Sequence, residues 1–134
     1  MSTEDRTAID PLVLALELAR KQILKPEQWT QGAYARTQAE HLSAMTKVLV
    51  SCSPNAPYAT CYCAVGSNER AVSKLDESKE AEGLSLETVH TVVLEGFNEA
   101  NGTDYDGLED ANDAADTTHA MVIAAYDHAI RELG

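Results

Sequence analysis

Aliphatic residues recur at helical spacing along most of the chain, and this pattern constrains the fold more than any other feature. Apolar side chains three or four positions apart form one stripe on a helix, and that stripe must be buried. The 134 residues include one Trp, one Phe and five Tyr, so the core is expected to consist of Leu, Val, Ile and Ala. The sequence therefore predicts a mainly all-α fold, with residues 1–134 in a single compact domain.

Capping residues and helix breakers separate the predicted helices. Asp10 followed by Pro11 is typical of a helix start, so Pro11 is the alternative beginning of a first helix otherwise counted from Ala8. Ser85 caps a later helix, which ends at Asn101-Gly102. The five expected helices span about residues 8–25, 34–50, 63–75, 85–100 and 119–133. Their expected buried faces include Ala35, Ala39, Leu42, Met45 and Leu49 in the second helix and Val122, Ala125, Tyr126, Ala129, Ile130 and Leu133 in the last.

The segments between these helices are rich in residues that favour turns. They are expected to be a connector with a bend at Gly32, a loop over 51–60 and a second loop over 101–116 rich in Asn, Gly and Asp. No segment shows convincing strand alternation. The residues 48–50 and the stretch around Tyr62 nevertheless allow one short β pairing.

Charge is distributed unevenly along the chain, whose net charge is −12. Residues 1–75 carry 8 basic and 7 acidic side chains, whereas residues 76–134 carry 2 basic and 15 acidic ones. Such an acidic half repels nucleic-acid phosphates and anionic lipid, and it favours basic proteins or divalent cations. Plain solubility is the simpler explanation of the same charge.

Two observations predict a cytoplasmic protein with no membrane association. No apolar run approaches the roughly 20 residues of a membrane span. Met1 is followed by Ser, Thr, Glu and Asp, which is the opposite of the basic start of a signal peptide. In that compartment the three cysteines are expected to be reduced thiols.

The cysteines favour packing over metal binding. Cys61 and Cys63 are separated by one residue and Cys52 lies nine residues before, whereas a structural zinc site needs four ligands, usually from two spaced pairs. We therefore expect neither a metal nor a cofactor. A reactive thiol at the start of a helix is an open alternative. Of the histidines, His119 lies in the first turn of the last helix, where capping is favoured over proton transfer.

Trp29 is the only tryptophan and stands in a polar connector. The simpler interpretation is an anchor that holds this connector on the core. The alternative is a stacking surface for the ring of a small ligand, with Gln28, Gln31 and Arg36 as polar partners, because a large apolar anchor beside converging polar groups is typical of small-molecule pockets.

Three short motifs, taken together, resemble a small family of uncharacterised bacterial and phage proteins. They are Trp-x-Gln-Gly-x-x-Ala-Arg at 29–36, Cys-x-x-Gly at 63–66 and Asn-Asp at 112–113. The resemblance covers most of the chain and implies a fold and a genomic setting rather than a reaction. The sequence departs from the family at Ser67 and in a longer stretch between the first two motifs, so the geometry of residues 37–60 is open.

The three motifs can be interpreted in two ways. Gly66 favours close helix approach, and Asn112-Asp113 favours a turn that caps the last helix. On this interpretation the motifs only pack the core. The alternative is that residues from all three converge on one ligand pocket, formed by Trp29, Gln31, Arg36, Cys63 and Asp113.

No catalytic motif is found, so a non-catalytic accessory protein or modulator is favoured. It would be encoded by a phage or mobile element and would bind a basic protein partner through its acidic C-terminal half, with mimicry of DNA as a special case. The alternative is a small-molecule or nucleotide binder, or a minor enzyme, centred on Trp29, Gln31 and Arg36. A structural homo-oligomer is a third interpretation.

Overall fold

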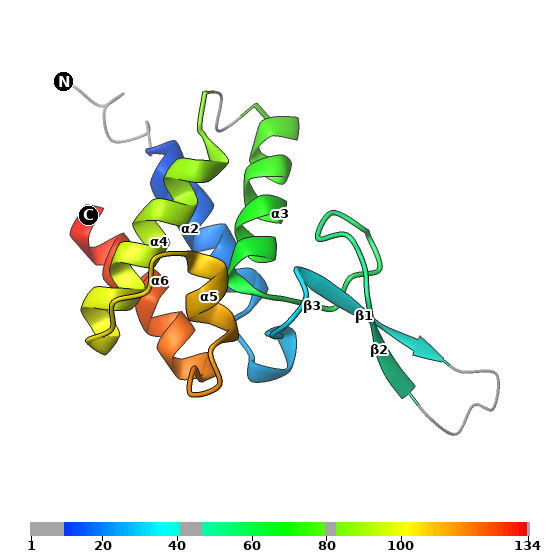
Figure 1. Ribbon diagram of the computed structural model, residues 1–134. Coiled ribbons are helices and arrows are strands. Elements are labelled where there is room, and N and C mark those ends of the chain that lie inside the picture. The colour runs from blue at the N-terminus through cyan, green and yellow to red at the C-terminus, as the bar shows by residue number, and fades with distance from the viewer. Residues whose placement is uncertain (1–9, 41–46, 80–82, 134) are drawn as a thin grey trace.

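The computed structural model describes residues 10–40, 47–79 and 83–133. A body of helices carries a small antiparallel sheet that projects from one side (Figure 1). The mainly helical fold predicted from the sequence is confirmed. The elements are α2 (Pro11–Gln22), η1 (Pro26–Gln28), β1 (Ala35–Glu40), β2 (Lys47–Ser51), β3 (Cys61–Tyr62), α3 (Ala64–Glu77), α4 (Leu86–Asn101), α5 (Leu108–Asp113) and α6 (His119–Leu133).

The caps predicted at Asp10 and Ser85 are confirmed. The Asp10 side chain accepts a hydrogen bond of 2.9 Å from the backbone N–H of Leu12, so α2 begins at Pro11. The Ser85 hydroxyl accepts one of 3.2 Å from the N–H of Glu87. At the other end of α4, Gly102 adopts a φ of 66°, a left-handed conformation that glycine reaches without a steric penalty.

The helix predicted over residues 34–50 is wrong. β1 and β2 occupy this stretch and pair antiparallel, from Arg36 opposite Ser51 to Glu40 opposite Lys47. Ala35 and Ala39 lie in β1 and Leu49 in β2, whereas Leu42 and Met45, expected on the same helical face, are outside the described residues. Alanine spacing fits a helix and a strand alike, and the β-branched residues of 47–51 favour a strand once a partner supplies the hydrogen bonds.

β3 completes a three-stranded sheet in the order β2-β1-β3. It pairs with β1 through Ala35 opposite Tyr62 and Arg36 opposite Cys61. The short β pairing allowed by the sequence is therefore present, but residues 48–50 and Tyr62 each pair with β1 and not with one another. Trp29 continues the sheet with a single bridge to Tyr62.

The predicted loop over 101–116 is interrupted by the short helix α5. Leu108 and Ala111, with exposed fractions of 6% and 0%, anchor it in the core. Glu109 and Asp110 stand in its first turn, where acidic side chains stabilise a helix. The run of turn-forming residues concealed this helix, because its two apolar residues are too few for a periodic pattern.

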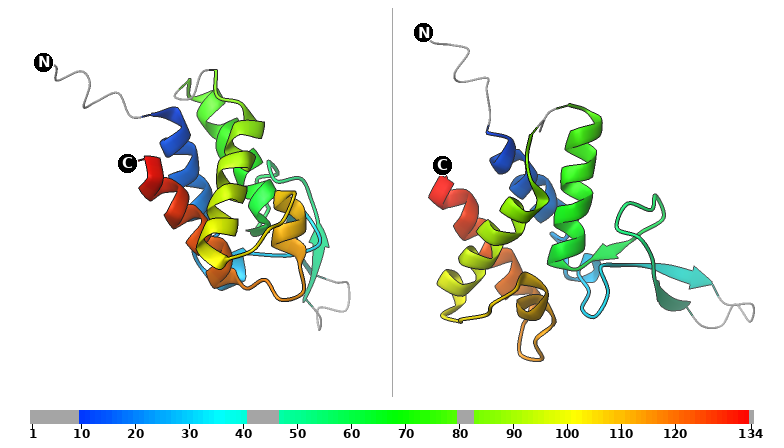
Figure 2. Two further views of the ribbon diagram at one scale, coloured as in Figure 1. Left: turned by 60° about the vertical axis from the view of Figure 1, so that its left-hand side comes forward. Right: turned by 45° about the horizontal axis from the view of Figure 1, so that its top comes forward.

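The core lies between α2, α3, α4 and α6, and a turned view shows α2, α4 and α6 side by side (Figure 2). α4 crosses α6 closely at Gly96, where an added β-carbon would lie 2.5 Å from the carbonyl oxygen of Ala125. On α6 the expected buried residues Val122, Ala125, Tyr126 and Ala129 are buried, and Ile130 packs partly against the core. Leu133, expected on the same face, is 41% exposed, because the last turn of α6 extends beyond the core.

Candidate functional site

The three sequence motifs meet at the side chain of Asn112, which is 1% exposed. Its Oδ1 accepts hydrogen bonds from Trp29 Nε1 at 2.7 Å and from the backbone N–H of Ala64 at 3.0 Å. Its Nδ2 donates to the carbonyl of Thr30 at 3.1 Å and to Asp113 Oδ1 at 2.9 Å. All the hydrogen-bonding groups of the amide are therefore used, and they join three segments that are distant in sequence.

Gln31 and Gly32 extend this junction over the end of α5. Gln31 Nε2 donates to the carbonyls of Asn112 at 2.9 Å and Ala114 at 3.0 Å, groups that a helix leaves without partners at its C-terminus. The N–H of Gly32 donates to Asp113 Oδ1 at 3.0 Å. Gly32 has a φ of 80°, so the bend expected there is present and needs the backbone freedom of glycine.

A small cavity of about 200 Å³ lies beside the junction. It is lined by Gly32, Ala33, Tyr34, Cys63, Glu109 and Asp113. The Tyr34 hydroxyl donates to Glu109 Oε1 at 3.1 Å, and this bond, the charge of Glu109 and desolvation raise the pKa of the phenol. Both carboxylates are exposed. The cavity is therefore polar and acidic, and suits a small neutral or cationic group.

Cys63 caps α3 through its side chain. Its Sγ accepts a hydrogen bond of 3.3 Å from the N–H of Gly66. Burial raises the pKa of the thiol to about 11, against the opposing effect of the helix N–H groups. The thiol is protonated at neutral pH and only 2% exposed. Cys52, Cys61 and Cys63 are all free thiols, and no group of three or more potential metal ligands is present within the described residues.

Four of the five predicted site residues come together at the junction: Trp29, Gln31, Cys63 and Asp113. Of the five predicted residues, only Cys63 and Asp113 line the cavity. The indole packs against the ring of His119, with ring centroids 6.1 Å apart, as expected of an anchor. Arg36 lies beside the junction, with its guanidinium next to Gly32. Its Nη2 would be 3.4 Å from a β-carbon added at that glycine. Ligand binding by these five residues stays a prediction.

Asn112 is the residue that sequence reasoning missed. The turn before the last helix predicted for the Asn-Asp pair is wrong, because both residues belong to α5. Nothing in the spacing indicates that the Asn112 amide contacts Trp29 and the start of α3. These contacts depend on how α5 packs against the connector. A buried asparagine is recognised only once its neighbours are known.

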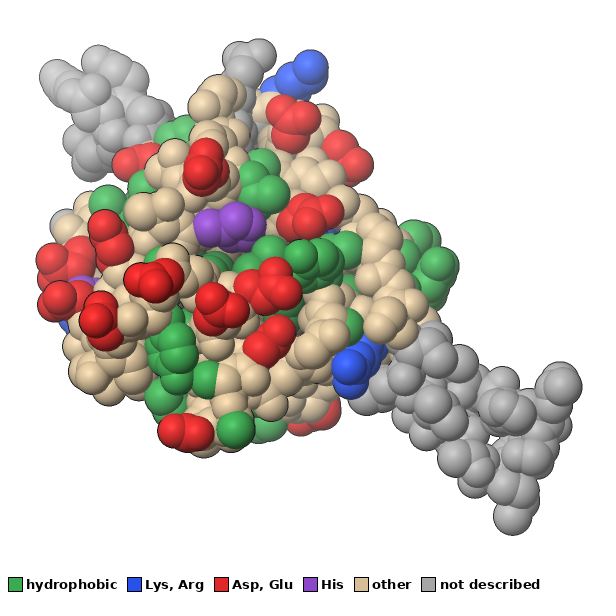
Figure 3. Space-filling view, viewed as in Figure 1, with side chains coloured by type: hydrophobic (Ala, Val, Ile, Leu, Met, Phe, Trp, Pro, Cys, Tyr) green, Lys and Arg blue, Asp and Glu red, His purple; other side chains and the backbone are tan. Residues whose placement is uncertain are grey.

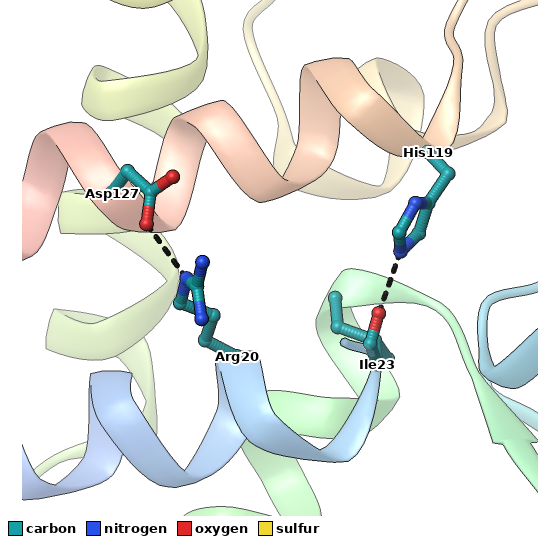
Figure 4. A network of polar contacts seen from close by, with 4 residues as sticks. All are labelled: Arg20, Ile23, His119 and Asp127. Carbon is teal, nitrogen blue, oxygen red and sulfur yellow. Dashed lines mark hydrogen bonds and ion pairs between the residues drawn. The ribbon is translucent and has the colours of Figure 1, made fainter. Parts of the chain in front are cut away.

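Two polar contacts hold α2 against α6 (Figure 4). Arg20 Nε donates to Asp127 Oδ1 at 2.6 Å in a partly exposed ion pair. His119 Nε2 lies 2.7 Å from the carbonyl oxygen of Ile23, so this nitrogen carries the proton and donates. His119 therefore caps the C-terminus of the neighbouring helix α2 and not the helix α6 to which it belongs.

A chain of buried polar groups runs between α3, α4 and α6. The Tyr126 hydroxyl donates to Asn68 Oδ1 at 2.5 Å and lies 3.2 Å from the carbonyl oxygen of Ala64. Asn68 Nδ2 faces His90 Nδ1 at 3.0 Å, so the amide donates and this ring nitrogen carries no proton. Burial lowers the pKa of His90, and the charge of Glu87 opposes this effect. The neutral imidazole is part of the packed structure.

An open groove of about 490 Å³ lies along the packed pair α4 and α6. Val92, Gly96, Ala129 and Leu133 contribute apolar surface to it. Three carboxylates surround this surface, and the groove also includes Asn98 and His128. These carboxylates belong to Glu95, Glu99 and Glu132. The exposed Leu133 thus lies at one end of a groove that combines apolar surface with negative charge.

A model described as a family of unknown function, DUF6197, matches residues 10–132. No curated protein and no solved structure shows significant similarity to the chain. Within the described residues, no helix is long and apolar enough to cross a membrane.

Proposed function

The chain belongs to this family of unknown function, as the motif resemblance predicted, and we propose that it is a non-catalytic modulator that binds a basic protein partner. The binding surface is the groove between α4 and α6, in the acidic half of the chain. We further propose a cytoplasmic location and a phage or mobile-element origin. The three free thiols support the location, and the motif resemblance supports the origin.

The composition of the α4–α6 groove carries this proposal. Val92, Ala129 and Leu133 provide apolar surface, and Glu95, Glu99 and Glu132 provide charge beside it. Protein interfaces combine a buried apolar centre with a polar rim. Here the rim consists of these three carboxylates together with Asn98 and His128. A partner with apolar and cationic side chains on one face complements both parts.

The carboxylates of this half are also available to a partner. Asp127 pairs with Arg20, and the described residues contain no further ion pair. Figure 3 shows carboxylates spread over one face of the helical body, with Lys and Arg mainly at its edges. Unneutralised charges of one sign attract an oppositely charged partner and accelerate its association.

An amphipathic helix is the form of partner that the groove fits best. Glu95 and Glu99 stand one turn apart on α4, and Glu132 faces the groove from α6. A helix in the groove would place its apolar residues against Leu133 and its Lys or Arg side chains along both walls. DNA mimicry is the special case in which the same basic surface of the partner also binds DNA.

A synthetic amphipathic peptide of Leu and Lys tests the proposal, with fluorescence anisotropy as the measurement. The triple variant Glu95→Gln, Glu99→Gln, Glu132→Gln is expected to bind it at least about tenfold more weakly, because three charge contacts are lost. The matched control neutralises three exposed carboxylates outside the groove, Asp104→Asn, Asp106→Asn and Asp110→Asn. Equal weakening in both variants, or binding unchanged between low and high salt, would contradict the proposal.

The cavity beside Asn112 favours a second candidate, the binding of a small ligand near Trp29. Glu109 and Asp113 make this cavity unsuitable for a phosphate and favour a small amine. The indole reports on this site, because Trp29 contacts Asn112 directly and Asn112 is adjacent to Asp113. Titration with primary amines should change Trp29 fluorescence, and an unchanged spectrum at millimolar concentrations would exclude this candidate.

A further inference from the structure

A second open groove, of about 520 Å³, has the opposite charge. It is lined by Leu18, Lys21, Gln22, Gln28, Ala59, Thr60, Tyr62, Arg70 and Lys74. Three of these residues are cationic and none is acidic, in a chain with 10 basic and 22 acidic side chains. The groove is therefore a local positive region on an acidic protein, and its volume is that of ordinary small-molecule sites.

Arg70 is held in place by the protein but is not fully used by it. Its Nη1 donates to the carbonyls of Pro54 at 2.8 Å and Ala56 at 3.2 Å. Its guanidinium also lies over the Tyr62 ring, 5.5 Å from the centroid. Nε and Nη2 have no hydrogen-bond partner among the described residues. A fixed guanidinium with unused donors on one edge can bind two oxygens of an anion, with little entropy lost on binding.

Two lysines add charge around this guanidinium. Lys74 is four residues after Arg70 on α3, so both side chains lie on the same face of the helix. Lys21 reaches the groove from α2, on its other side. Both lysines are exposed and can adjust to a ligand, whereas Arg70 is half-buried and fixed.

Gln22, which lines the same groove, carries a buried acceptor without a partner among the described residues. Its Nε2 donates to the carbonyl and the hydroxyl of Ser67 at 2.8 and 2.9 Å, and the carbonyl fixes the orientation of the amide because it can only accept. The opposite atom, Gln22 Oε1, is the one buried side-chain nitrogen or oxygen without a hydrogen-bond partner in the described part of the chain. Such a group is costly unless something donates to it. Because this oxygen is buried, a ligand in the groove does not reach it, but the Gln22 amide signals report on occupancy of the groove.

We propose that this groove binds a small organic phosphate. The phosphate lies against Nε and Nη2 of Arg70, with Lys21 and Lys74 neutralising its remaining charge. The organic part packs against Leu18 and the Tyr62 ring. This site is separate from the acidic groove between α4 and α6, and it does not depend on the function proposed for that groove.

Ribose 5-phosphate is the test ligand, with ribose and acetate as comparisons. Titration is followed by NMR through the Arg70 Nε–H signal and the Gln22 side-chain amide signals. We expect ribose 5-phosphate to shift both groups of signals with a saturating curve. Ribose should shift neither, because it lacks the anion, and acetate should shift Arg70 weakly and leave Gln22 unchanged. Equal responses to ribose 5-phosphate and ribose would overturn the proposal. A titration that does not saturate at ligand concentrations about tenfold above a millimolar dissociation constant would also overturn it.

Variants separate a built site from general electrostatic attraction. Lys74→Gln removes an exposed charge from the groove and should weaken binding about two- to fivefold. Arg70→Lys keeps the charge but loses the planar fork, and should weaken binding about tenfold or more. Arg131→Gln removes one charge from α6, outside the groove, and should leave the affinity unchanged. If Arg70→Lys disturbs the fold, the comparison of Lys74→Gln with Arg131→Gln still tests the proposal. An equal loss of affinity in these two variants contradicts a specific site.

Discussion

The indole nitrogen of Trp29 donates a hydrogen bond of 2.7 Å to the side-chain oxygen of Asn112, which lies 83 positions further along the chain. The same oxygen accepts the backbone N–H of Ala64, 3.0 Å away at the start of α3. One amide thus links the connector after α2, the start of α3 and the end of α5. The three motifs are joined by buried and partly buried hydrogen bonds, and the small acidic cavity lies at their edge.

Replacement of Asn112 is expected to destabilise the protein severely. Asn112→Ala leaves Trp29 Nε1 and the N–H of Ala64 without their acceptor, and each unsatisfied buried donor costs about 1–3 kcal/mol. We expect a loss of about 2–5 kcal/mol in the free energy of unfolding, measured by urea denaturation. Asn55→Ala, at an exposed position, should change it by less than about 0.5 kcal/mol. A similar small change for Asn112→Ala would show that the junction contributes little.

The contribution of the Trp29–Asn112 hydrogen bond can be isolated. Trp29→Phe keeps an aromatic ring beside His119 but removes the N–H donor. This variant should lose about 1–2 kcal/mol of stability. Combined with Asn112→Ala in a double-mutant cycle, the two changes should couple by about 1 kcal/mol or more, because they remove one shared bond. Additive effects would mean that the indole is held by packing alone.

Gly66 is expected to tolerate no side chain. A β-carbon there would lie 1.8 Å from the carbonyl oxygen of Tyr34, which is backbone and cannot rotate away. Gly66→Ala should therefore cost about 4 kcal/mol or more, or prevent folding, as judged by thermal denaturation followed by circular dichroism. The control is Gly107→Ala, whose β-carbon would meet only Asp110 Oδ2 at 3.6 Å. Near-native stability of Gly66→Ala would show that β1 and α3 can separate at this point.

Cys63 is expected to be unreactive in the folded protein. Its pKa of about 11 and its burial reduce the thiolate available at pH 8 by roughly a hundredfold or more relative to an ordinary thiol. Alkylation by iodoacetamide, followed by mass spectrometry of digests, should label the half-buried Cys52 well before Cys63. Addition of denaturant should remove the difference. Labelling of Cys63 at the rate of Cys52 in native buffer would restore the reactive-thiol interpretation.

His90 is expected to make stability fall as the pH is lowered. Its pKa is lowered in the folded state, so below the ordinary value of about 6.5 the unfolded chain binds a proton that the folded protein resists. The stabilising contribution is complete above about pH 6.5 and is lost as the pH falls from there to the lowered pKa of the folded state. His90→Gln keeps an acceptor for Asn68 without titrating, and should reduce this loss in urea denaturation between pH 7 and 5. His128→Gln should retain it, and equal pH profiles for the wild type and His90→Gln would contradict the prediction.

Local sequence signals predicted much of the helical framework. Asp10 with Pro11, Ser85, and Gly102 mark helix ends through contacts within a few residues, so their effect is independent of the rest of the fold. The buried stripe of α6 also followed from spacing, except at Leu133, which lies beyond the core. Of the five residues expected to form a site, four meet at the junction, because the motifs that contain them pack together.

What the sequence by itself determined is the mainly helical fold and the separation of charge along the chain, since both depend on composition and on neighbouring residues. Only the tertiary structure decided that residues 35–40 form a strand, because β pairing depends on partners at residues 47–51 and 61–62. It also decided the role of Asn112, whose partners lie up to 83 positions away. The same holds for the basic groove around Arg70, because cations from α2 and α3 become neighbours only when those helices pack.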